Sequence, residues 1–340
     1  LFWTLLPPAA LVVALVVAVG TVAARRASRE LPDALRRAKH DNMVLEGAGT
    51  DHRPWVEVPR ARRLHISSFS TAQTAVALQC QNTASLRVSY LMMLQSIIVP
   101  PGGLCRLTDL CLEHCPTLNI ASLNQTLGQC PALRELRAVN LSRLGGGGLP
   151  GVHLQLRHPR LRRLRVEWTE CAPGVHLRTV HLAGCPRLEE LTLHIEKRIM
   201  RWKAWTAIRL PPSLHTVEWR YNTRCTETRQ LCDQLPHVRA LTWGGPTYGR
   251  HALSLKQVVD LGVVLNPYVC ALDLARCPAL RGVRFLRHAR TTKYHIRMIR
   301  LPPGPGGAAG GVRVELPPQC GRPQDFYDAI QRGQDPPGMT

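Results

Sequence analysis

The stretch Leu107-Thr108-Asp109-Leu110-Cys111-Leu112-Glu113-His114-Cys115 places apolar residues at a spacing that recurs along the chain. The same apolar-x-x-apolar-x-apolar spacing, ending on Cys or Asn, begins again at Leu177, Leu214 and Val269. Looser copies start at Leu133, Leu161, Leu188, Val238 and Leu280. A period of this kind is typical of solenoids, in which each repeat adds one strand and a return segment. The spacing therefore predicts a stacked repeat array.

The distances between copies predict where the strands begin. The starts at Leu107, Leu133, Leu161, Leu188, Leu214 and Val238 are 26, 28, 27, 26 and 24 residues apart. The copy at Leu177 lies only eleven residues before Leu188, so the two cannot begin strands of separate coils. One of the pair must lie on the convex side of its coil, and the same ambiguity holds for Val269 and Leu280.

The alternation within each copy predicts which side chains face the core, because successive side chains of a strand point to opposite faces. Leu and Val therefore point inward, and the intervening residues form an outer, solvent-facing surface. Trp219 and Trp243 occupy inward positions and are predicted to be core residues. Cys115, Cys185 and Cys277 are expected to be buried as small hydrophobic residues.

A Cys-Pro-x-Leu variant appears at Cys130, Cys185 and Cys277, with His158-Pro159-Arg160-Leu161 as a departure. These repeats resemble the leucine-rich-repeat family, cysteine-containing type, found in F-box adaptors and in small mitochondrial coupling-factor and complex-assembly proteins. The resemblance covers residues 60–301. It implies an α/β solenoid with a curved parallel sheet on its concave face and irregular or helical returns on its convex face. No F-box is visible upstream, which disfavours a ubiquitin-ligase adaptor.

The segments outside the repeats suggest a membrane anchor. Residues 1–24 carry no charge and are long enough to cross a bilayer, which needs about 20 residues. Arg25, Arg26 and Arg29 follow directly, and we expect them to contact lipid head groups. By the positive-inside rule the rest of the chain lies on the cytosolic or matrix side. A cleaved signal peptide is the alternative.

Four segments follow from these patterns. Residues 1–24 are predicted to form a transmembrane helix, and residues 25–59 a basic juxtamembrane helix with a polar linker. Residues 60–301 form the repeat domain, and residues 302–340 an extended tail rich in Pro and Gly.

Charge and cysteine content limit the kinds of partner and the cellular compartment to be expected. The 340 residues carry a net charge of +21, which favours an acidic partner, although Arg-rich, GC-rich codon usage offers a plainer explanation. The twelve cysteines include no Cys-x-x-Cys pair, so we expect neither a metal site nor a disulfide scaffold. Thiols of this kind indicate a reducing compartment, such as the cytosol or an organelle matrix.

A stripe of arginines is predicted along the concave sheet, at outward positions. Its members are Arg134, Arg137, Arg162, Arg163, Arg165, Arg239, Arg281 and Arg284. Glu residues are interleaved on the same face. The stripe is therefore either a solvated surface with cross-strand ion pairs or a docking face for an acidic partner.

A second basic segment runs over residues 194–209 and contains Trp202 and Trp205. Mixed basic and aromatic residues suit RNA or a membrane interface. A return helix that covers the array with its apolar residues is the favoured interpretation.

Catalytic motifs are not visible. The chain lacks a phosphate-binding Gly-x-x-x-x-Gly-Lys-Ser/Thr loop, a His-Glu-x-x-His motif and a Gly-x-Ser-x-Gly motif. We therefore expect a protein that is not an enzyme and has no cofactor.

These patterns together predict a membrane-anchored scaffold, an accessory subunit of a respiratory-chain or ATP synthase complex. The expected place is the mitochondrial inner membrane, with the bulk on the matrix side. Partner subunits would bind the repeat surface and tail, and a cardiolipin-like anionic phospholipid the basic flank. The first alternative is a mitochondrial ribosomal subunit that contacts RNA. It would use Arg162, Arg163, Arg165, Lys197, Arg198 and Arg201. The second alternative is a cell-surface receptor, which would carry disulfides.

Overall fold

In a computed structural model of the chain, the part described comprises thirteen segments. They are residues 42–46, 55–57, 61–67, 75–100, 102–141, 152–168, 177–195, 207–220, 231–244, 249–264, 270–286, 296–302 and 312–315. The predicted transmembrane segment and its flank of Arg25, Arg26 and Arg29 lie outside these residues. Within the described ranges, no helix is both long and apolar enough to cross a bilayer.

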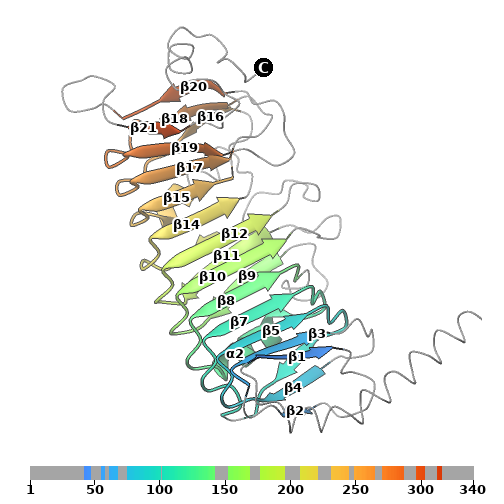
Figure 1. Ribbon diagram of the computed structural model, residues 1–340. Helices are drawn as coiled ribbons and strands as arrows, with labels where there is room; N and C mark the ends of the chain where they lie inside the picture. The colour runs from blue at the N-terminus through green and yellow to red at the C-terminus, as the bar shows by residue number, and fades with distance from the viewer. Residues whose placement is uncertain are drawn as a thin grey trace, which may run out of the picture.

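Twelve strands of the described chain form one long parallel sheet that runs the length of the molecule (Figure 1). They are β1 (Asn42–Glu46), β3 (Arg63–Ser67), β5 (Ser85–Ser89), β7 (Asp109–Glu113), β8 (Glu135–Val139), β10 (Arg163–Trp168), β12 (Glu190–Ile195), β14 (Thr216–Arg220), β15 (Ala240–Trp243), β17 (Asp260–Val264), β19 (Gly282–Leu286) and β21 (Arg313–Glu315). They stack in chain order, each coil adding one strand. The chain is thus a parallel β-solenoid.

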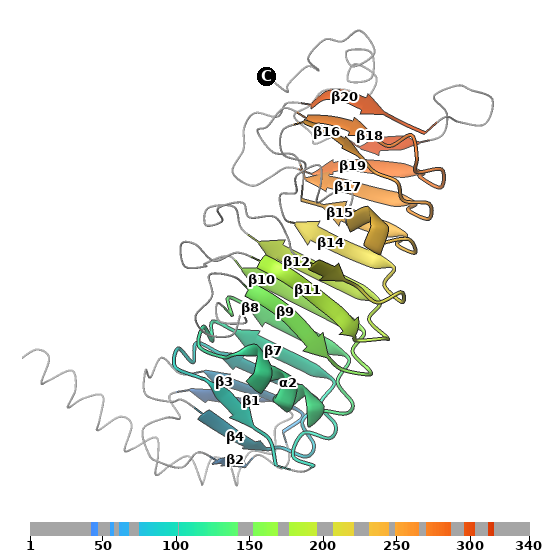
Figure 2. The same ribbon diagram turned by 180° about the vertical axis from the view of Figure 1, so that it is seen from behind.

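The opposite side carries three short parallel sheets and short helical segments in the described residues (Figure 2). The first sheet contains β2 (Trp55–Glu57), β4 (Ala75–Gln79) and β6 (Ser96–Ile98), and the second β9 (Val152–Arg157), β11 (Leu177–Gly184) and β13 (Ala207–Arg209). The third contains β16 (Gly249–Ala252), β18 (Cys270–Asp273) and β20 (Ile296–Arg300), and α2 spans Ile120–Gly128. The copies at Leu177 and Val269 therefore lead into returns, whereas Leu188 and Leu280 lead into the long sheet.

These short sheets correct the expectation of irregular or helical returns. In the second sheet Leu154, Leu156, Val180 and Leu182 are buried, and each alternates with a more exposed residue. A period of two is the pattern of a strand with one face on the core. The two sheets of each coil thus press alternate side chains into a shared interior, and helical residues occur in two described returns, α2 and the turn at residues 231–234.

The register of the long sheet places equivalent residues side by side. Leu110 pairs with Leu136, which pairs with Leu164, and all three are buried. Trp219 and Trp243 pair on neighbouring strands, and each is 0% exposed, which confirms that they are core residues. Burying a large apolar side chain stabilises the fold by roughly 1.5–3 kcal/mol, so the continuous inward rows account for much of the stability.

Several described coils enter the long sheet through a turn whose first residue is buried. Cys130, Cys185 and Cys277 hold this position, and the carbonyl of Cys130 accepts a hydrogen bond from the Leu133 N–H at 3.0 Å. Proline in second place suits the fixed φ of such a turn. His158 takes the same buried position in the next coil. The Cys-Pro-x-Leu pattern is therefore a turn that starts a strand.

The long sheet extends on both sides of residues 60–301. Strand β1 of this sheet precedes the range and β21 follows it, while β2 of a short sheet also lies before it. Val314 of β21 pairs with Val283 of β19 and is buried like the inward residues of other coils. The sequence around Val314 is dominated by Gly and Pro, which hid a single three-residue strand.

Candidate functional site on the outer face of the long sheet

The outer face of the long sheet carries the residues that alternate with the buried rows. Of the predicted arginine stripe, Arg137, Arg163, Arg165 and Arg284 lie in strands at outward positions. The other members directly precede strands and form the edge where the strands begin. These are Arg134, Arg162, Arg239 and Arg281. The structure thus divides the stripe between a face and an edge.

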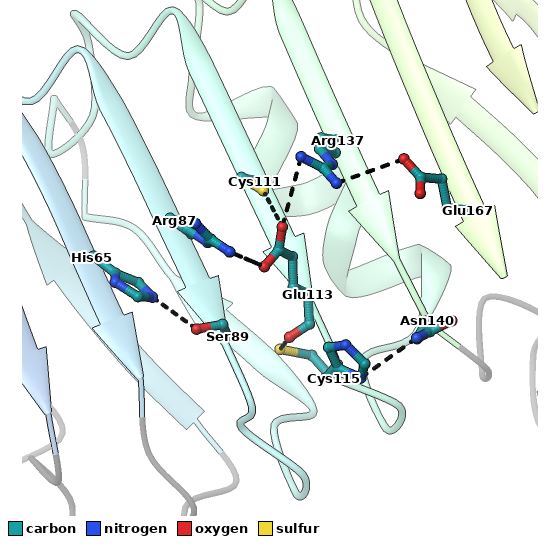
Figure 3. A network of polar contacts seen from close by, with 10 residues as sticks. His65, Arg87, Ser89, Cys111, Glu113, Cys115, Arg137, Asn140 and Glu167 are labelled. Carbon is teal, nitrogen blue, oxygen red and sulfur yellow. Dashed lines mark hydrogen bonds and ion pairs between the residues drawn. The ribbon is translucent and has the colours of Figure 1, made fainter. Parts of the chain in front are cut away.

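A chain of charged side chains runs across the four neighbouring strands β5, β7, β8 and β10 of this face (Figure 3). Its centre is Glu113 on β7, a residue that is only 7% exposed. Arg87 on β5 donates to Glu113 Oε2 at 2.5 Å, and the Cys111 thiol donates to Oε1 at 3.3 Å. Arg137 on β8 approaches the same carboxylate at 4.0 Å. One buried acid therefore holds side chains from both neighbouring strands.

The chain continues to the next strand through a second acid. Arg137 lies 3.7 Å from Glu167 on β10, and Arg165 donates to the same carboxylate from its own strand. Charge-assisted hydrogen bonds of this kind are stronger and more directional than neutral ones. The guanidinium groups are about half exposed, so their free donors remain available at the surface.

Burial and charge have opposing effects on Glu113. Burial raises the pKa of Glu113. The hydrogen bonds from Arg87 and Cys111 and the charges of Arg87 and Arg137 together lower it by more than burial raises it, so the pKa lies below its usual value. Burial raises the pKa of Cys111 to about 12, reinforced by the adjacent Glu113 charge. The Cys111 thiol is therefore protonated at neutral pH. A nucleophilic cysteine would instead need to be a thiolate at this pH.

Two hollows lie on the outer face. One has a volume of about 510 Å³ and lies over β5, β7, β8, β10 and β12, with residues of both charges around it. The other, of about 270 Å³, exists because Gly262, Gly282 and Ala240 present little or no side chain to the surface. Arg284 binds Glu315 at 2.6 Å beside this second hollow. Both hollows are open to solvent and differ in this from an enclosed ligand pocket.

Five of the eight stripe arginines form ion pairs. Arg163 meets Glu135 at 2.5 Å and Glu190 at 3.3 Å, and Arg162 meets Glu189 at 3.6 Å. Arg137, Arg165 and Arg284 pair as described above. Arg134, Arg239 and Arg281 have no ion pair within the described part of the chain. Cross-strand ion pairing is thus observed, and docking of an acidic partner stays a prediction.

Sequence reasoning missed the central position of Glu113 and its partner Arg87. The signal was present, since Leu86-x-Val88 places Arg87 at the outward position of its strand, beside Cys111 and Arg137.

The conformation of the residues that follow these strands was not predicted from the sequence either. Tyr90, His114 and Asn140 all adopt positive φ, between 52° and 60°, and the Tyr90 and His114 rings stack at 4.7 Å.

The cysteines at the repeat positions are part of the hydrophobic core. Cys115, Cys185 and Cys277 are each 0% exposed, as predicted, and they are free thiols, as are five further cysteines of the described segments, Cys80, Cys105, Cys111, Cys130 and Cys232. Those segments contain no group of three His, Cys, Asp or Glu residues placed to hold a metal ion. Of the basic segment 194–209, residues 196–206 with Trp202 and Trp205 lie outside the described residues.

Taken residue by residue, this face is a fixed pattern of arginines and carboxylates on a parallel β-solenoid. Neither the family models, nor the curated proteins, nor the solved structures with which the chain was compared give a match.

Proposed function

We propose that the chain is a non-catalytic scaffold of leucine-rich-repeat type that binds a protein partner across the outer face of its long sheet. The observation that supports this most is the chain of charges from Arg87 through Glu113, Arg137 and Glu167 to Arg165. Its side chains are already held in place, so a partner would meet an ordered surface and lose less conformational entropy on binding.

The charge pattern favours a folded protein over a polyanion as this partner. Carboxylates at Glu113, Glu135 and Glu190 alternate with the arginines, so the face presents both signs of charge. A nucleic-acid site needs a continuous positive track, because phosphate contacts supply most of its affinity. Alternating charges suit a complementary protein surface, where they contribute specificity and correct registration. RNA binding therefore ranks second.

The membrane setting belongs to the same proposal. Residues 1–24 would anchor the chain in the mitochondrial inner membrane, with the solenoid on the matrix side as an accessory subunit of a respiratory-chain or ATP synthase complex. Arg25, Arg26 and Arg29 would contact a cardiolipin-like phospholipid. The uncharged segment, its basic flank and the net charge of +21 support this placement.

Co-purification tests the proposal. Tagged full-length chain is isolated in mild detergent, and companion proteins are identified and quantified by mass spectrometry. We expect Arg163→Glu with Arg165→Glu to remove specific companions, because the variant reverses two charges on the outer face. The matched control is Arg157→Glu with Arg209→Glu, which changes two exposed arginines of the sheet on the opposite side.

The control should keep the same companions, and both variants should match the parent in thermal unfolding. An identical set of companions from both variants would contradict binding through the outer face. Companions of the mitochondrial inner membrane are expected, and companions from another membrane or from the ribosome would contradict the proposed setting.

A further inference from the structure

A cluster of four arginines lies at the edge of the long sheet, where β8, β10 and β12 begin. Arg134, Arg160, Arg162 and Arg187 surround a cavity of about 180 Å³, with Ala132 and Thr108 completing its lining. All four arginines are exposed. The cluster is separate from the ion-pair chain of Glu113, which lies on the outer face.

The repeat explains why a cavity forms at this place. Arg160 and Arg187 occupy the third position of successive turns, and the preceding coil has Ala132 there. Arg134 and Arg162 directly precede β8 and β10, and their backbones are joined by a hydrogen bond of 2.8 Å between Arg162 N–H and the Arg134 carbonyl. Neighbouring strands lie about 4.8 Å apart. Arg160 therefore lies beside Arg187, and Arg134 beside Arg162, while the short side chains of Ala132 and Thr108 leave the space between them open.

The backbone beneath the cluster is held firmly. The Leu188 N–H donates to the Cys185 carbonyl at 3.0 Å, which closes the turn that carries Arg187. The buried His158 ring bridges two coils. Its Nδ1 accepts from the Arg160 N–H at 3.3 Å, so its Nε2 carries the proton and donates to the Cys130 carbonyl at 3.0 Å. The arginines therefore extend from fixed points.

The charges of the cluster are not balanced. Glu189 is the single described carboxylate paired with one of its members, at 3.6 Å from Arg162. Arg134, Arg160 and Arg187 have no ion pair in the described ranges. Like charges so close together repel, and a doubly charged anion would relieve this repulsion while accepting several guanidinium hydrogen bonds.

We infer that this cavity binds a phosphate monoester carried by a protein partner, such as a phosphorylated serine. The inference rests on the proposed function and names the chemistry of one contact. The volume is below the 300 Å³ or more of a typical small-molecule pocket, so the cavity suits one group on a larger partner. Arginine clusters recognise phosphorylated segments in this manner.

The composition of the edge argues against RNA. The cavity has no aromatic residue in its lining, although stacking on aromatic rings is the usual means of holding unpaired bases. The positive charge is also interrupted along the edge, because Glu189 separates Arg162 from Arg239 in this row, and Val259 separates Arg239 from Arg281. One isolated cluster fits one phosphate group better than a phosphate backbone.

Binding of labelled peptide pools tests the inference. Full-length chain in detergent is titrated into fluorescein-labelled random peptides with a fixed central phosphoserine, and into a matching serine pool, with fluorescence anisotropy as the readout. We expect the phosphoserine pool to bind at least about tenfold more tightly, and inorganic phosphate to compete. Arg160→Ala with Arg187→Ala should remove this preference.

Arg239→Ala with Arg281→Ala is the matched control, because both arginines precede strands at the same edge and lie far from the cavity in chain order. The control should keep the preference, and thermal unfolding should show that both variants fold. Equal binding of the two pools, or equal loss in the control, would overturn the inference. So would stronger binding to single-stranded RNA or to phosphatidylserine vesicles that is lost in the Arg160 and Arg187 variant.

Co-purification with the same variant separates this inference from the proposed function. If companions are lost in the outer-face variant and yet are retained both by Arg160→Ala with Arg187→Ala and after phosphatase treatment, the phosphate site is refuted and the proposed function stays intact. Loss of companions on phosphatase treatment of the parent, matched by their loss in the variant, is the expected result.

Discussion

His158 shows how a repeat position can accept an unusual residue. It stands where neighbouring coils have Cys130 and Cys185, and it is 2% exposed. Burial lowers the pKa of His158, the hydrogen bond to Cys130 raises it, and the charge of Arg160 lowers it, with a net decrease from 6.5. The neutral ring, with one donor and one acceptor used, is therefore the form that fits.

The first prediction concerns pH. Because the pKa of His158 is lower in the folded chain, the unfolded chain binds the proton first, and stability falls as the pH drops below about 6.5. We expect His158→Cys, which restores the residue of other coils, to lose less stability between pH 7 and pH 5. Urea unfolding of both chains at the two pH values measures this. A larger loss in the variant would contradict the assignment.

The second prediction concerns Glu113. Glu113→Gln removes the charge that holds Arg87 and Arg137, so we expect it to cost roughly 1–3 kcal/mol of unfolding free energy at pH 7. The pKa of Glu113 is lowered in the folded chain. Its contribution is therefore present above about pH 4.5 and is lost as the pH falls through the folded pKa.

Urea unfolding at pH 7 and pH 3.5 checks both parts of this prediction. The control is Glu135→Gln, since Glu135 is an exposed ion-pair partner of Arg163 and solvent-exposed pairs of this kind contribute little to stability. An effect of Glu113→Gln no larger than that of the control would show that the buried acid does not organise its neighbours.

At the scale of elements, α2 offers the clearest capping interaction. The Asn119 side chain accepts from the Ser122 N–H at 2.8 Å at the start of the helix. We predict that Asn119→Ala costs about 1 kcal/mol, whereas Asn119→Asp changes stability little, because Asp is an equally good cap. Thermal unfolding compares the two. Equal destabilisation by both substitutions would mean that the amide group acts in another way.

The strand-entry turns give a chemical prediction. Burial raises the pKa of Cys130 to about 12 and that of Cys185 to about 11, so both thiols are protonated and inaccessible in the folded chain. Among the described cysteines, Cys105 is exposed. We expect maleimide to label Cys105 in the native chain, and Cys130 and Cys185 only in urea. Peptide mass spectrometry locates the label, and native labelling of Cys185 would refute the buried turn.

The elements also show what the sequence could predict. The long-sheet strands followed from the spacing of inward Leu and Val, because a row of side chains must align in every coil. The strands on the opposite side were harder to foresee, since Val76, Ile97 and Ile208 lie in short stretches that suit either a strand or an irregular return. The arginine cluster could not be predicted, because it depends on which turns align across coils.

At the scale of the molecule, the solenoid predicts tolerance to the loss of a whole coil. Arg163 and Glu190 are register partners, so deleting residues 164–190 joins the start of β10 to the rest of β12. Each coil contacts mainly its neighbours, and we expect the shortened chain to fold with lower stability. Deleting only residues 164–176 removes part of a coil and should prevent folding. Circular dichroism and urea unfolding distinguish these outcomes.

The even stacking of the long sheet also limits how a helical partner could lie upon it. Rows on the outer face repeat about every 4.8 Å, while each turn of a helix advances about 5.4 Å. The two periods drift apart by about 0.6 Å per coil, so a straight helix laid across the strands is half a row out of phase after about four coils. The side chains of a long straight helix can therefore match the rows of the sheet only over a few coils. A partner that contacts more of the sheet must bend or bind through separate segments.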